Sequence, residues 1–150
     1  MADDIGVVGA GFAYLVAGIH LAHPKLGLPR LVLLTQFQSL ELLANDPRPV
    51  VFVISGVAII LGVPLAATNH YQKPIYVIGI LLMLTYISGY FAWHLSGHGG
   101  FLPGREPLYH GLTPVQAVVA HLGSDSWAAV AIVAEMMLIG VLAVLYLRET

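Results

Sequence analysis

The stretch from Trp127 to Leu147 carries a single charged residue, Glu135, close to its centre. An apolar stretch of this length is typical of a helix that crosses a lipid bilayer. A carboxylate at the middle of such a helix costs about 2.5–3.5 kcal/mol on insertion scales. Because of this cost, Glu135 is expected either to serve a function or to be protonated and hydrogen-bonded to a neighbouring helix.

Composition places the whole chain among membrane proteins. Of its 150 residues, 58% are hydrophobic and only 9% are charged, whereas soluble domains usually carry about 25% charged residues. The net charge of −2, with six basic residues, argues against a nucleic-acid partner. The absence of cysteine excludes disulfides, iron–sulfur clusters and thiolate metal sites.

Four apolar stretches predict four transmembrane helices in one bundle, a single membrane domain of residues 1–150. They cover residues 5–22, 50–68, 75–95 and 127–147. At a rise of 1.5 Å per residue, each is long enough for a hydrocarbon core of about 30 Å. The predicted fold class is therefore an all-α integral membrane protein, located in the cell membrane.

Two of the connections predict helices of their own. Residues 30–46 alternate apolar and polar positions with a helical period, which predicts an interfacial amphipathic helix along the membrane surface. Its apolar face is formed by Leu33, Phe37, Leu40 and Leu43. In the third connection, Thr113 and Gln116 form a capping-box pattern around Pro114, which predicts a short helix from this point.

The orientation of the predicted bundle follows from its basic residues. Four spans place both termini on one side and the two long connections on the other. The long connections hold Lys25, Arg30, Arg48 and Arg105, against Lys73 and Arg148 on the terminal side. Because basic residues are enriched in cytoplasmic loops, this bias favours long connections in the cytoplasm.

The histidines are segregated to the side of the long connections. Six of the seven are expected there: His20, His23, His94, His98, His110 and His121. His94 with His20 or His23 would suit a bis-imidazole pair for haem b, with His98 close by. His110 and His121, together with Glu41 or Asp46, would suit a metal ion. A quinone head group, or an interfacial role with no ligand, also fits the pattern.

Glu135 is expected to meet only neutral polar groups at its depth in the bundle. The candidates from the other spans are Tyr14, Ser55, Thr85 and Tyr86. None is basic, so no internal salt bridge is expected. A hydrogen-bonded network with Tyr14 or Tyr86 would be structural, and a wet path to the histidines would make Glu135 a proton relay.

Small residues in the first span predict a packing face. Gly6, Ala10, Ala13 and Ala17 recur at helical spacing, which lets membrane helices approach closely. The same region matches a dinucleotide-binding fingerprint by letter. However, the stretch is one apolar segment and lacks the strand–loop–helix context that this motif requires.

No catalytic nucleophile, phosphate loop or metalloprotease motif is visible, so the chain is not expected to be catalytic on its own. The leading hypothesis is a non-catalytic subunit of a larger membrane assembly, redox or respiratory, with its histidine face at a haem, metal or quinone. Its expected partners are lipid and other membrane subunits or further copies of itself. A small proton or cation channel using Glu135 is the alternative, and a purely structural scaffold is the third hypothesis.

Overall fold

Six helices make up the computed structural model, which describes residues 2–36, 46–68 and 71–149 and has no β-strand within these ranges. They are α1 (Ala2–Ala22), α2 (Leu28–Gln36), α4 (Arg48–Ala66), α5 (Gln72–Leu95), α6 (Pro114–Ser124) and α7 (Ser126–Arg148). Four of them, α1, α4, α5 and α7, are long and apolar enough to cross a membrane. The predicted all-helical fold with four long apolar helices is therefore confirmed.

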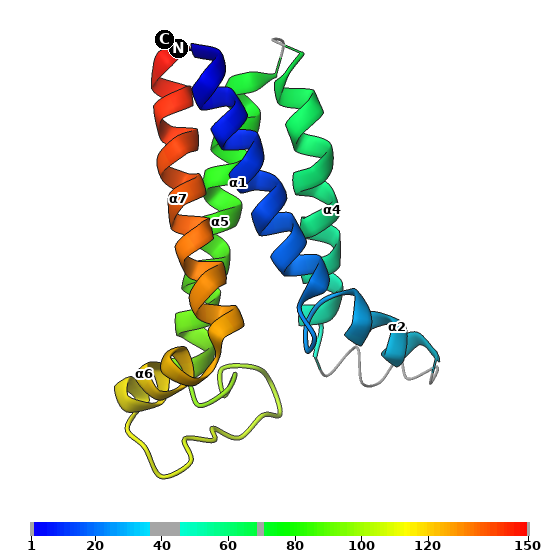
Figure 1. The fold of residues 1–150 in the computed structure, drawn as a ribbon. Helices are drawn as coiled ribbons and strands as arrows, with labels where there is room; N and C mark the ends of the chain where they lie inside the picture. The colour runs from blue at the N-terminus through cyan, green and yellow to red at the C-terminus, as the bar shows by residue number, and fades with distance from the viewer. Residues whose placement is uncertain (1, 37–45, 69–70, 150) are drawn as a thin grey trace.

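The four long helices run side by side, and successive ones run in opposite directions (Figure 1). The largest contacts join α5 to α7, α1 to α4 and α1 to α7. Both chain ends lie together at one end of the bundle, which we call the terminal end. At the other end, the loop end, lie α2, α6 and the connection formed by residues 96–113. The two long connections thus share one end, as the sequence predicts.

The core lies where α1, α5 and α7 meet. Val16, Met83 and Leu138 are almost completely buried there, together with Ala13, Ile19 and Ala134. Ala13 and Ala17 are buried as expected of the predicted small-residue face. A Cβ atom on Gly6 would meet nothing within 4 Å, so this residue is not part of the contact.

The helix in the first long connection begins at Leu28 and is described as far as Gln36. Leu34 is its buried residue, whereas Leu33, which is expected on the apolar face of the interfacial helix, is 42% exposed. The reason is that α2 packs against α4 and α1, and this contact sets which side is covered. Phe37, Leu40 and Leu43 lie outside the described residues.

The helix in the third connection begins where its capping pattern predicts. The Gln116 backbone N–H donates to Thr113 Oγ1 (3.4 Å), and the Thr113 N–H donates to Gln116 Oε1 (3.0 Å). Asp125 separates α6 from α7 and caps α7, accepting hydrogen bonds from the first N–H groups of that helix. The short turn at Asp125 holds α6 across the loop end of the bundle.

Close packing of α1 on α4 depends on Gly56. A Cβ atom at this position would lie 2.8 Å from Leu21 Cγ and 3.4 Å from Ala17 O. We expect Gly56→Val to destabilise the fold by about 1–3 kcal/mol, the usual cost of overpacking. Thermal unfolding in mild detergent, followed by circular dichroism, measures the change. Gly18→Val is the control, because a Cβ there meets nothing within 4 Å; equal losses in both variants would contradict the prediction.

Candidate functional site

Three histidines from three segments meet at the loop end. His94 comes from the last turn of α5, His98 from the loop that follows and His121 from α6. Each offers one ring nitrogen, and these three atoms lie within 4.8 Å of one another. The ring of His110 lies beside them, 5.1 Å from that of His98 and 6.1 Å from that of His121 between centroids. We call His94, His98 and His121 the histidine cluster.

Unusual backbone geometry brings His98 into this cluster. Gly97, His98 and Gly99 are successive residues with positive φ, at 67°, 58° and 85°. Left-handed backbone is rare for residues other than glycine. In the described parts of the chain only His98 and His110 adopt it without being glycine. Such conformations cost about 1–3 kcal/mol and gather at functional sites. The turn reverses the chain after α5, so that His98 returns over His94.

Hydrogen bonds orient two of the three imidazoles. His94 Nδ1–H donates to Tyr90 O (2.9 Å), and His121 Nδ1–H donates to Ala117 O (2.7 Å). A ring that donates through Nδ1 carries its lone pair on Nε2, which is the arrangement usual for metal-binding histidines. In His98, Nε2 is buried and has no hydrogen-bond partner. The cluster therefore presents free nitrogen lone pairs to one small volume.

The surroundings keep His98 in the form that binds metals. Burial lowers the pKa of the His98 imidazole, and the neighbouring His121, His94 and His110 lower it further. A lowered pKa means that the ring is neutral at pH 7. Neutral imidazole is the ligand form, because a protonated ring has no lone pair to offer.

A first-row transition-metal ion fits the histidine cluster. Tetrahedral zinc has Zn–N distances of about 2.0–2.1 Å, which place two nitrogen donors about 3.3 Å apart. The three nitrogens lie within 4.8 Å of one another. Small rotations of the rings would close the difference. Imidazole donors suit zinc, copper, nickel and iron, and three of them leave a fourth position open.

Asp46, one of the two acidic ligands expected from the sequence, does not join this cluster. Asp46 forms a bidentate ion pair with Arg48, with both N···O distances at 2.7 Å. Burial raises the pKa of Asp46, but the hydrogen bonds and charge of Arg48 outweigh it, so the net shift is downward. The Arg48 guanidinium in turn lies 3.5 Å above the Trp93 ring. Glu41 lies outside the described residues.

The structure divides the histidines differently from the expected haem and metal sets. His20 contacts Tyr86, which precedes His94 on α5 by two helical turns, or about 12 Å of helix. His23 packs against Phe52 and Trp127. His20 and His23 thus lie against aromatic rings, and the ring of His94 lies against those of His98 and His121. His94 and His98 instead join His121, from the expected metal set.

A second polar site lies inside the bundle. His20 Nε2 and Glu135 Oε1 are 2.9 Å apart and join α1 to α7. His20 is 0% exposed and Glu135 3%. The expectation that Glu135 has no basic partner was therefore wrong. Helical side chains tilt toward the N-terminus of their own helix. Because α1 and α7 run in opposite directions, the side chains of His20 and Glu135 lean toward each other along the bundle. This tilt lets the two groups meet although their backbones lie at different depths.

Aromatic rings surround the imidazole of His20. Its centroid lies 4.9 Å from that of Phe52 and 4.3 Å from that of Tyr86. The Tyr86 hydroxyl bonds to Ser55 and donates to Val51 O (3.0 Å). His20 Nδ1 is buried without a hydrogen-bond partner. Tyr86 thus lies beside the site as expected from the sequence.

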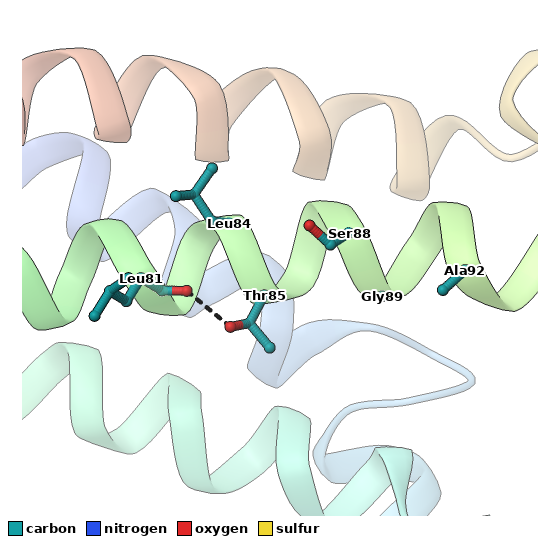
Figure 2. A pocket seen from close by; sticks show the side chains of 6 residues that line it. All are labelled: Leu81, Leu84, Thr85, Ser88, Gly89 and Ala92. Atoms are coloured by element: carbon teal, nitrogen blue, oxygen red, sulfur yellow. Dashed lines mark hydrogen bonds between the residues drawn. The ribbon is translucent and has the colours of Figure 1, made fainter.

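Two other residues expected beside Glu135 lie elsewhere. Tyr14 is 49% exposed on α1 and is not part of a buried network. Thr85 lies on the exposed face of α5, where its hydroxyl donates to Leu81 O (2.8 Å), as Figure 2 shows. This outward face forms a shallow groove of small and apolar side chains: Leu81, Leu84, Thr85, Ser88, Gly89 and Ala92.

Tyr90 was not predicted as a site residue. It lies on α5 between Tyr86, beside His20, and His94, in the histidine cluster. Its ring lies 4.3 Å from that of His94, and its hydroxyl is buried without a partner. Tyr86, Tyr90 and His94 are spaced four residues apart, so they share one face of the helix. That spacing is the sequence pattern that could have identified Tyr90.

No protein-family model, curated protein or solved structure matches this chain. The geometry and chemistry of its own side chains are therefore the basis for assigning a function.

His23 provides a measurable check on the electrostatics of the loop end. Burial lowers the pKa of His23, Asp125 opposes the shift and His20 adds to it. The Trp127 ring lies 5.9 Å away. In a Trp93→Phe background, we expect Trp127 fluorescence to be quenched only below the ordinary histidine pKa of about 6.5, when the ring gains its proton. His23→Gln should remove this response; a midpoint above 6.5 would contradict the prediction.

Proposed function

We propose that this chain is an integral membrane protein that binds a transition-metal ion through His94, His98 and His121. The observation that carries the proposal is the convergence of three imidazole nitrogens within 4.8 Å. The Nδ1 hydrogen bonds of His94 and His121 support it, because they direct Nε2 of each ring toward a ligand. The metal would sit where the bundle meets its long connections.

Insertion in a membrane is supported by the outward surface of the long helices. Each one exposes large apolar side chains that water would not favour but lipid would accept. One residue from each helix illustrates this: Val7 (72% exposed), Ile54 (64%), Ile78 (63%) and Val133 (63%). The basic residues of the long connections favour an orientation in which the loop end faces the cytoplasm. The metal site would then lie on the cytoplasmic side.

The contacts within the cluster favour a metal ion over haem b. The rings of His94, His98 and His121 contact one another, with centroids 4.6–5.3 Å apart. These direct contacts leave no space for a porphyrin between any two of the rings. A bis-imidazole haem site needs two rings on opposite faces of the macrocycle. A single ion needs the lone pairs to converge, which is the arrangement that these rings have.

We further propose that the protein acts as a non-catalytic subunit of a larger redox assembly in the membrane. An open three-histidine site can hold a redox-active ion such as copper or iron. No carboxylate or nucleophile of the described residues joins the cluster, and in this proposal a partner subunit supplies the substrate-converting centre.

Metal titration of the purified protein in mild detergent tests the site. We expect one Co²⁺ per chain, with visible absorption bands from imidazole coordination. His121→Ala removes one ligand and should abolish these bands, whereas His23→Ala should retain them because His23 lies outside the cluster. Unchanged Co²⁺ binding in His121→Ala would contradict the proposal. A haem α-band in the reduced-minus-oxidised spectrum would favour haem b instead.

Partner recovery tests the assembly. Gentle solubilisation after crosslinking in membranes should bring other subunits down with this chain, because a non-catalytic subunit is expected to work in a complex. Mass spectrometry of the purified material identifies them, and a sample crosslinked after harsh detergent treatment serves as the control. A chain that runs alone as one monodisperse species, with no crosslinked product, would rule out the assembly.

A further inference from the structure

The His20–Glu135 pair carries a second inference, which is independent of the metal site. The two side chains come from the first and last long helices and are almost completely buried. A buried carboxylate beside a single imidazole, with aromatic rings around it, resembles neither a surface ion pair nor an apolar core contact. Ionisable groups in such positions are retained at substantial cost, so they are candidates for function.

Neither protonation state of this pair is fully satisfied. With two protons the pair is neutral overall, and His20 Nδ1 carries a hydrogen that finds no acceptor. When the pair holds one proton, that proton lies between His20 Nε2 and Glu135 Oε1. The pair then has a net charge of −1, and His20 Nδ1 is an acceptor without a donor. A buried unpaired N–H and a buried net charge are both unfavourable. The surroundings therefore do not lock the pair in either state.

The terminal side of the pair is closed by apolar side chains. Val16 on α1, Met83 on α5 and Leu138 on α7 lie one turn or less beyond the pair in that direction, at 1%, 0% and 2% exposure. They leave no hydrogen-bonding group among themselves to carry a proton. The path toward the terminal end is therefore blocked.

The loop side offers a short route to solvent. His23 lies three residues beyond His20 on α1, so both rings share one face of the helix. His23 also lines a cleft of about 280 Å³ together with Lys25, His121, Asp125 and Trp127. The cleft, His23, His20 and Glu135 thus lie in sequence from solvent to core.

We propose that His20 and Glu135 form a proton-binding site that exchanges with solvent only at the loop end, through His23. The site takes up one proton without moving it across the bundle. In this proposal the chain stores a proton next to the membrane interior and does not conduct it, because Val16, Met83 and Leu138 close the terminal side.

The groups that face the site from each helix are few. α1 contributes His23, α4 the hydroxyl of Ser55, α5 the phenol of Tyr86 and α7 Glu135 itself. Near His23, the charged groups are Lys25, Arg48 and Asp125. His121 lines the same cleft as His23. The contributions of these two imidazoles must therefore be separated from that of the pair by mutation.

Infrared difference spectroscopy of the full chain in mild detergent tests proton binding. We expect the C=O band of a protonated carboxyl to change in amplitude with pH. Glu135→Gln should remove the part of this change that comes from the buried carboxyl, and Glu106→Gln, at an exposed position, should retain that part. If Glu135→Gln does not fold, His20→Gln serves instead and should shift the midpoint of the band. A Glu135 band that stays constant with pH would overturn the proposal and leave a structural pair.

Kinetics and flux test the one-sided access. After a pH jump, the fast phase of the carboxyl band should be lost in His23→Leu and kept in Trp127→Phe. An unchanged fast phase in His23→Leu would overturn the route. In sealed vesicles, the wild-type protein should add no proton flux above that of empty vesicles. Flux that disappears in Glu135→Gln would show a continuous path and overturn the one-sided site in favour of a channel.

Discussion

The hydrogen bond between His20 and Glu135 is the constraint on which the bundle depends most. It joins the first long helix to the last, at a depth where no water competes for either group. Removing one partner of a buried ionisable pair leaves the other uncompensated, at a typical cost of about 3–5 kcal/mol. Because α1 also packs on α4, this hydrogen bond helps to set how the two halves of the chain meet. The apolar core of Val16, Met83 and Leu138 lies directly beside it and closes the bundle on the terminal side.

The two polar sites occupy different levels of one helix face. On α5, Tyr86 lies against His20, and His94 belongs to the histidine cluster two turns further on. The buried site has a carboxylate and restricted access to solvent, whereas the cluster has three imidazoles and an open end. Their chemistry differs accordingly, since a carboxylate–imidazole pair exchanges protons and converging imidazole lone pairs bind metal ions. Tyr90 lies between them and contacts His94.

Much of the architecture could be predicted from local sequence patterns. The four long helices follow from apolar length, and the start of α6 follows from the capping box at Thr113 and Gln116, because both depend on residues close in sequence. Which residue of α2 is buried against the bundle was not predicted, since Leu34 is covered by contacts with other helices. The gathering of His98 with His121 also lay beyond the sequence. It requires a left-handed turn at Gly97–Gly99 and the placement of α6 across the bundle.

The sequence by itself determined that the chain forms long apolar helices, that its histidines collect at one end and that Glu135 is buried. These properties depend on composition and on spacing along the chain. Only the tertiary structure decided which groups pair: His20 with Glu135 in the core, and His94 with His98 and His121 at the loop end. The physical reason is that pairing depends on the direction in which side chains tilt along antiparallel helices, and on backbone turns between them. Neither is encoded in any short segment of the chain.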